Sequence, residues 1–120
     1  RKEWMIQDRE SHIEIYEQLE LPKDLPSAFV CNSDLAASKL IKALKEKGYR
    51  VPEDISVVGY DDYLYPGLRD IGITTYSVDM EKMSQVGMEM LLERMGGSEN
   101  PYIMQVIEGK FIKRDSVQER

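Results

Sequence analysis

One segment limits the possible folds of this chain more than any other: residues 51–62, which read Val-Pro-Glu-Asp-Ile-Ser-Val-Val-Gly-Tyr-Asp-Asp. Within it, residues 55–58 are rich in β-branched side chains and predict a short buried strand. A second apolar run at residues 27–31 predicts another strand. Residues 34–47 between the two runs have the spacing of an amphipathic helix, whose apolar face would contain Ala36, Leu40, Ala43 and Leu44. A helix that joins two short buried strands predicts a parallel pair with a right-handed crossover.

A polar residue follows each of these two predicted strands: Asn32 after the first and Asp61 after the second. Because parallel strands end at the same edge of a sheet, where open α/β folds bind ligands, the two residues predict a small-molecule site. Each residue also has a purely structural interpretation. Either Asn32 or Ser33 can cap the following helix, and aspartate often forms turns after a strand.

The rest of the chain offers few further elements. Residues 73–76 predict a short strand, and Asp79 can cap a helix over residues 80–95 that Gly96 and Gly97 close. Residues 102–107 and 110–113 are two more extended candidates. The helix over residues 80–95 carries five methionines on more than one side, which favours the hypothesis that the chain lacks its natural neighbours at a domain or subunit contact.

Composition excludes several classes of function. The chain has 120 residues with 42% apolar content, enough for one modest core, and its formal charge of -6 disfavours direct contact with a phosphate backbone. The single cysteine, Cys31, fits a reducing compartment, and no apolar run approaches the roughly 20 residues of a membrane span. We therefore expect a cytoplasmic protein. The first residues carry neither an initiator methionine nor an apolar run, so we also expect a fragment of a longer chain.

The chain lacks the groups that catalysis or metal binding needs. His12 is its only histidine, so neither a Ser-His-Asp nor a Cys-His arrangement has a well-placed base. No His and Cys spacing typical of a metal site occurs, and Gly96-Gly97 follows a helix rather than the strand that a phosphate loop requires. The sequence predicts no enzyme, no metal and no cofactor.

Several segments, in order, resemble the C-terminal part of the effector-binding domain of LacI/GalR (lac repressor/galactose repressor) transcription regulators. Residues 51–62 are the most specific of them; the others are Pro26-Ser27-Ala28, Cys31-Asn32-Ser33, Ile73-Thr74-Thr75 and Arg114-Asp115-Ser116. The resemblance covers residues 26–117. It implies an α/β fold, a three-layer parallel-sheet lobe of the periplasmic-binding-protein-like (type I) kind. Residues 1–120 would be the C-terminal lobe with its crossover segments, without the DNA-binding domain and most of the N-terminal lobe.

The resemblance also implies a function. A sugar effector would be hydrogen-bonded by Asn32 and Asp61, while Trp4 would be the aromatic platform for the sugar ring or else a packing or lobe-contact residue. The regulator would be a dimeric repressor or activator that meets DNA only through a domain outside this chain. Ser33 and the Ser77-Val78 pair depart from the family pattern, and the second departure, which lacks the family's usual glutamine, suggests an effector unlike the family's typical sugars. A transport-associated periplasmic sugar-binding protein and an α/β enzyme fragment are the alternatives.

Overall fold

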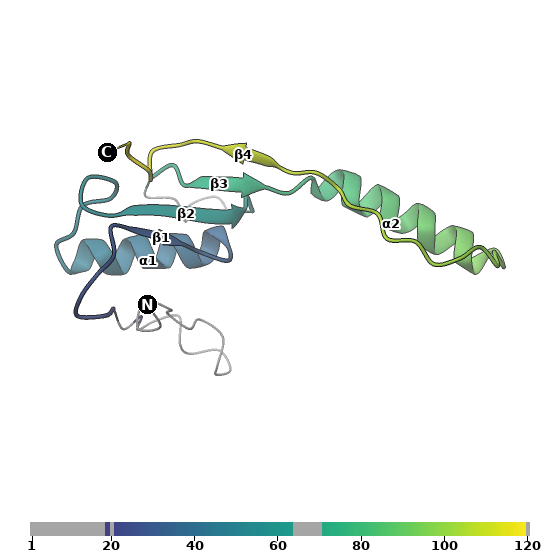
Figure 1. Cartoon of the computed structure of the whole chain (residues 1–120), viewed down its shortest axis with the longest axis horizontal. Helices are drawn as coiled ribbons and strands as arrows, with labels where there is room; N and C mark the ends of the chain where they lie inside the picture. The colour runs from purple at the N-terminus through teal and green to yellow at the C-terminus, as the bar shows by residue number, and fades with distance from the viewer. Residues whose placement is uncertain (1–18, 20, 64–70, 120) are drawn as a thin grey trace.

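The molecule consists of a small lobe, built on a sheet, and a long arm that projects from it. The structure is a computed structural model that describes residues 19, 21–63 and 71–119. Figure 1 shows the sheet with one helix along one of its faces, while a second helix extends far beyond the sheet. The arm makes the molecule elongated, with dimensions of 58 × 32 × 31 Å.

The lobe begins with the predicted strand–helix–strand unit. Strand β1 (Ala28–Val30) leads into helix α1 (Asp34–Glu46), and the chain returns as strand β2 (Ser56–Asp61). Strands β1 and β2 pair in parallel, as predicted. Gly48, just beyond the helix, has a φ of +87°, which suits glycine at the end of a helix.

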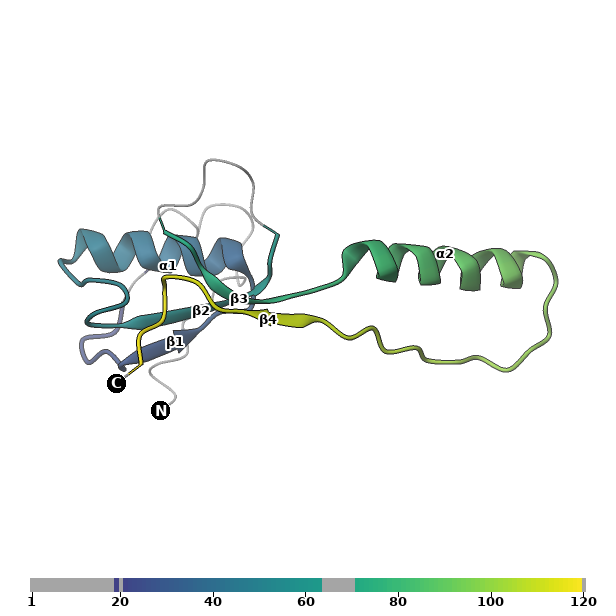
Figure 2. The same cartoon turned by 90° about the horizontal axis from the view of Figure 1, so that it is seen from above.

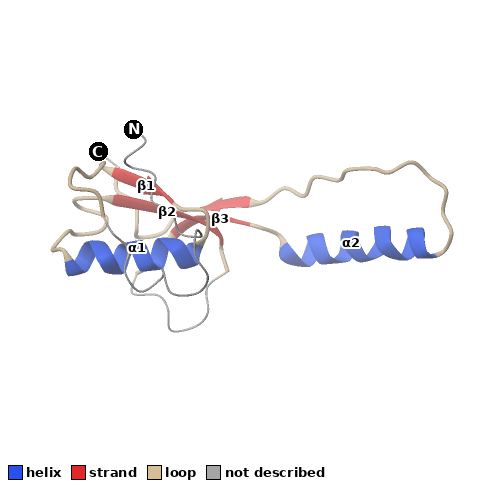
Figure 3. Cartoon of the chain, turned by 90° about the horizontal axis from the view of Figure 1, so that it is seen from below, coloured by secondary structure: helices blue, strands red, loops and turns tan. Residues whose placement is uncertain are grey.

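Two further strands complete the sheet in the order β1-β2-β3-β4. Strand β3 (Thr74–Ser77) runs parallel to β2, and strand β4 (Lys110–Ile112) runs antiparallel to β3. The predicted α/β class with a predominantly parallel sheet is confirmed. Figure 3 shows α1 lying along the strands, while α2 lies away from them.

The core of the lobe lies between α1 and the sheet. The predicted buried face of this helix contained Ala36, Leu40, Ala43 and Leu44, but only the two leucines of that set are buried. The buried side chains of α1 are Asp34, Ala37, Leu40, Ile41 and Leu44. The apolar spacing alone is compatible with either of two neighbouring faces of the helix. The face that contains the larger Ile41 side chain is the one that packs into the core.

The arm comprises residues 79–107. It starts with helix α2 (Met80–Met95), whose first turn is capped by the Asp79 side chain, as predicted. The chain turns at Gly97 (φ +86°) and returns alongside the helix to β4 (Figure 2). Residues 102–107 form no strand, contrary to their prediction as an extended element, whereas the prediction at residues 110–113 corresponds to β4.

Most of the arm is exposed to solvent. Val86 is the one buried residue of α2. The large apolar side chains that remain exposed on the arm are Met80, Met83, Met88, Leu91, Leu92, Met95, Tyr102, Ile103, Met104 and Val106. Within the described part of the chain, no helix is long and apolar enough to cross a membrane.

Candidate functional site

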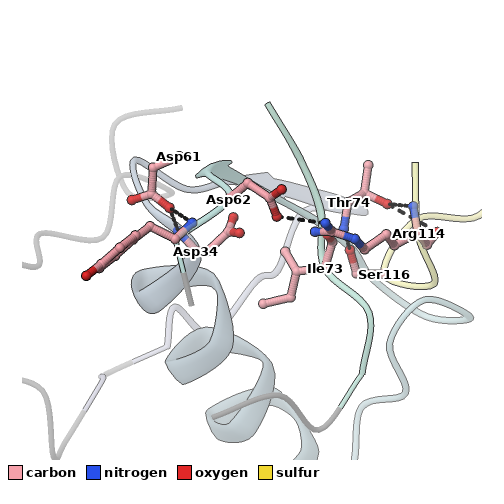
Figure 4. A network of polar contacts seen from close by, with 8 residues as sticks. Asp34, Asp61, Asp62, Ile73, Thr74, Arg114 and Ser116 are labelled. Carbon is pink, nitrogen blue, oxygen red and sulfur yellow. Dashed lines mark hydrogen bonds and ion pairs between the residues drawn. The ribbon is translucent and has the colours of Figure 1, made fainter. Parts of the chain in front are cut away.

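The candidate site lies at the edge of the sheet where β1 and β2 end. Asp61 is the last residue of β2, and Asn32 follows the end of β1 by two residues. The two strand ends are tied together here, because the backbone N–H of Asp34 donates to Asp61 Oδ1 at 3.4 Å (Figure 4). Because β1 and β2 are parallel, both strands end at this edge of the sheet, as predicted.

The Asp61 carboxylate is half-buried and held by backbone amides. Its Oδ1 atom accepts hydrogen bonds from the N–H of Tyr63 at 2.9 Å and from that of Asp34. The second donor belongs to the first turn of α1, where unpaired N–H groups and the helix dipole favour a negative charge. Among the described residues, Oδ2 accepts no hydrogen bond, and a carboxylate oxygen of this kind can accept one from a ligand.

The Asn32 side chain is free of the structural role that the sequence left open for it. Ser33 caps α1 instead: its hydroxyl oxygen accepts a hydrogen bond from the N–H of Ala36 at 3.1 Å. Asn32 is exposed, and its amide makes no hydrogen bond to any residue that the structure describes. Trp4, the third predicted site residue, lies outside the described residues.

Asp62, the next residue along, is tied to the far end of the chain. Its Oδ1 atom accepts a hydrogen bond from Arg114 Nη2 at 2.7 Å, and the same guanidinium donates through Nη1 to the carbonyl of Ile73 at 2.9 Å. Its partner Arg114 is 52 residues away in the sequence. No local pattern in the sequence could have indicated such a pair.

Asp34, the first residue of α1, is a buried acid whose burial the sequence does not indicate. Its side chain is fully buried against Gly59, where any Cβ atom would collide with the carboxylate. Burial raises the pKa of Asp34; the Thr75 hydroxyl, which lies beside it, lowers the pKa in part. The contact with Thr75 falls short of hydrogen-bond geometry, so both carboxylate oxygens lack a partner among the described residues.

The described charged residues at this edge are not arranged as a metal site. In the part of the chain that the structure describes, no group of three or more His, Cys, Asp or Glu side chains is arranged to hold a metal ion. What the edge offers is an acceptor at Asp61 and an amide with both donors and an acceptor at Asn32. Such a pair suits a neutral ligand rich in hydroxyl groups.

Comparison with known proteins gives the class of this fold. Residues 2–117 match the model of the periplasmic binding protein-like domain family, and the chain belongs to that family. Within it, the resemblance to LacI/GalR effector domains is confirmed by the relatives. The transcriptional repressor PurR of Pectobacterium carotovorum is 34% identical over 121 residues, which cover 98% of this chain and 35% of the repressor.

Solved structures agree with this assignment. A LacI-type transcription regulator from Bifidobacterium animalis superposes with a TM-score of 0.72 at 26% identity, covering 78% of this chain and 34% of the regulator. The regulator CelR in complex with cellobiose gives a TM-score of 0.69 at 30% identity, over 75% of this chain and 28% of CelR. The chain thus spans about a third of the length of the curated relatives it matches.

Proposed function

We propose that this chain is the effector-sensing C-terminal lobe of a LacI/GalR-type transcription regulator, and that Asn32 and Asp61 bind a sugar. The observation that carries the proposal is the shared edge of β1 and β2. There, a carboxylate fixed by two backbone amides keeps one oxygen without a described partner, and an exposed amide follows the neighbouring strand. Structural neighbours described as complexes with cellobiose, lactose and ribose support a sugar as ligand.

The proposed regulatory mechanism depends on the position of the effector site, because Asn32 and Asp61 belong to a single lobe. An effector that also contacts a second lobe would favour one relative orientation of the two, and so shift the population of the DNA-binding state. Trp4 is our candidate for stacking on the sugar ring. DNA would be bound by a domain outside this chain, in the cytoplasm, and we assign the chain no catalytic role.

We further propose that the regulator acts as a homodimer, with the outer face of α1 contributing to the contact. On this helix, Leu40 belongs to the core. Leu35, Ala36 and Lys39 are half-buried and remain the candidates for the contact. The neighbour described as a lac repressor dimer bound to operator supports a dimer. The periplasmic transport protein is less well supported, because the curated relatives are repressors.

The test uses the complete regulator that contains this chain, titrated in turn with cellobiose, lactose and ribose in a calorimeter. For the sugar that binds, Asp61→Asn removes a charge-assisted hydrogen bond of about 1.5–3 kcal/mol and should weaken affinity roughly ten- to a hundredfold. Asp115→Asn is the matched control. It makes the same chemical change at the opposite end of the sheet, where the Asp115 N–H bonds to the carbonyl of Gly72, and should leave affinity unchanged.

Two results would count against the proposal. If Asp61→Asn binds the sugar as tightly as the parent protein does, Asp61 is not part of the site. If none of the three sugars binds, the ligand class is wrong, and a wider panel of small metabolites becomes the next experiment.

A further inference from the structure

Asp61 and Asp62 hold an uncommon backbone conformation. Their φ angles are +94° and +53°, so two residues with side chains stand in succession in the region that favours glycine. Aspartate tolerates this region better than most residues, yet it persists only where surrounding contacts hold it. The orientation of the Asp61 carboxylate depends on this conformation, because the side chain leaves the backbone at that point.

The contacts that hold the pair come from two directions. Asp61 is held locally, by the N–H groups of Tyr63 and Asp34. Asp62 is held by Arg114, and the two side chains are largely shielded, with 20% of Asp62 and 22% of Arg114 exposed. An ion pair with this degree of shielding is screened less than a pair on the open surface.

Arg114 is itself fixed in place. Its backbone N–H donates to Thr74 Oγ1 at 2.9 Å, and its guanidinium binds the carbonyl of Ile73. Two residues later, the buried Ser116 hydroxyl accepts from the N–H of Thr74 and donates to the carbonyl of Val57. These contacts run from Ser116 through Thr74 and Arg114 to Asp62, and Figure 4 shows Asp62 next to Asp61 and Asp34.

Repulsion among neighbouring carboxyl groups is a second reason why Arg114 matters here. Asp34, Asp61 and Asp62 place three carboxyl groups close enough for Asp61 and Asp62 to raise the pKa of Asp34, after the larger effect of burial, while Arg114 opposes them. Removing the guanidinium would leave the carboxylates to repel one another. Asp62 would lose its only hydrogen-bonded partner within the described residues.

We propose that Arg114 is a positioning residue for the effector site: it binds Asp62 and the Ile73 carbonyl, and thereby keeps the Asp61 carboxylate directed at the start of α1. The claim that this orientation matters for an effector rests on the proposed function. The claim that Arg114 controls the orientation does not.

The test is amide hydrogen exchange measured by NMR on this chain without any sugar. The Tyr63 amide reports the orientation of Asp61, because its hydrogen bond requires the carboxylate in place. The Leu44 amide, within α1, reports the stability of the whole lobe.

In Arg114→Met, protection of Tyr63 should fall on the order of tenfold relative to Leu44. Arg114→Lys keeps the charge and should restore part of that protection. The matched control is Arg50→Met, which breaks an exposed pair with Asp54 and should leave the ratio unchanged.

Asp62→Asn provides an independent variant, since Arg114 keeps its bonds to Ile73 and Thr74. It should lower the protection of Tyr63 in the same direction, and combining it with Arg114→Met should add little, because both changes break the same ion pair. If Arg114→Met does not fold, Asp62→Asn and Arg114→Lys decide the matter. Tyr63 protection that stays unchanged, or that falls only in parallel with Leu44, would overturn the proposal.

Sugar titration of the same variants in the complete regulator then separates the two proposals. Local loss at Tyr63 together with unchanged sugar affinity would leave Arg114 as a positioning residue and contradict the role of Asp61 in binding. Unchanged protection at Tyr63 together with an affinity that depends on Asp61 would support the role of Asp61 in binding and contradict the role of Arg114 as a positioning residue.

Discussion

At the scale of single residues, the buried Asp34 carboxyl is energetically costly. It is fully buried, and neither of its oxygens has a hydrogen-bond partner within the described part of the chain. A buried acid of this kind is disfavoured in its charged form and binds a proton more tightly in the folded than in the unfolded state. It lies beneath the proposed site, and its backbone N–H is one of the two that hold Asp61.

This burial predicts a pH dependence of stability. The folded-state pKa of Asp34 is raised above its ordinary value of 3.8, chiefly by desolvation. The folded state therefore holds more protons than the unfolded state between the two pKa values, and stability falls as the pH rises through that interval. Asp34→Asn should flatten the fall, as measured by urea unfolding between about pH 4 and 7. Equal slopes for parent and variant would contradict the assignment.

Gly59 gives a prediction of steric origin. A Cβ atom at this position would collide with the Asp34 carboxylate and approach Ile73 Cγ2 to 3.1 Å. Gly59→Ala should destabilise the lobe by about 1–3 kcal/mol, as overpacking does in a closed core. Gly87→Ala is the matched control: its new methyl group meets nothing within 4 Å, and within α2 it should stabilise by about 0.5–1 kcal/mol. Thermal unfolding measures both effects: the melting temperature should fall in Gly59→Ala and rise in Gly87→Ala.

A double variant checks the cause of the Gly59 effect. Asp34→Ala removes the atoms that the new methyl group would strike, so Gly59→Ala should cost less in that background than in the parent protein. If the cost is equal in both backgrounds, the contact with Ile73 is responsible and the collision with Asp34 is not.

At the scale of elements, the sequence was most informative where local signals and burial agree. The parallel β1–α1–β2 unit could be predicted because β-branched strands, a helix of regular period and a terminal glycine all indicate the same fold. The cap and the end of α2 could be predicted for the same reason. The buried face of α1 could not, because two apolar phases fit the helix and only the sheet selects between them.

Some features of the candidate site could be predicted from the sequence and others could not. Asn32 and Asp61 could be located because parallel strands end together, which is a property of the topology. The Asp62–Arg114 pair and the burial of Asp34 against Gly59 could not be located, since each joins residues distant in sequence without a local pattern. Sequence periodicity reports which way a residue faces within its own element; it does not report which residue of another element lies opposite.

The two helices should respond differently to the same truncation. Leu44 in α1 is fully buried in the core of the lobe, whereas Leu92 in α2 is 58% exposed. Leu44→Ala should lower the free energy of unfolding by about 2–5 kcal/mol, because it leaves a cavity. Leu92→Ala should change it by no more than about 0.5 kcal/mol. Urea unfolding of both variants measures the difference; similar losses would mean that α2 packs more closely against this chain than the structure indicates.

At the scale of the whole molecule, the arm is the unusual feature. It carries an apolar surface with a single buried residue on its helix, and it holds itself together mainly at its tip. There, the Arg94 guanidinium stacks 4.4 Å from the centre of the Tyr102 ring and donates to the carbonyls of Ser98 and Asn100. Exposed apolar patches of this kind mark surfaces that pack against another body.

The isolated chain should therefore associate with itself as its concentration rises, giving a light-scattering mass above the 13.9 kDa of one chain. The double variant Leu92→Glu, Met104→Glu places two charges on the arm and should restore the monomer, because burying them in an apolar contact is costly. The control Ser27→Glu, Gln118→Glu adds the same charge on the lobe and should leave association in place, which separates loss of the apolar contact from repulsion between more acidic molecules. A parent chain that stays monomeric at all concentrations would mean that the arm needs no partner, and the view of the chain as one part of a larger effector domain would lose its physical support.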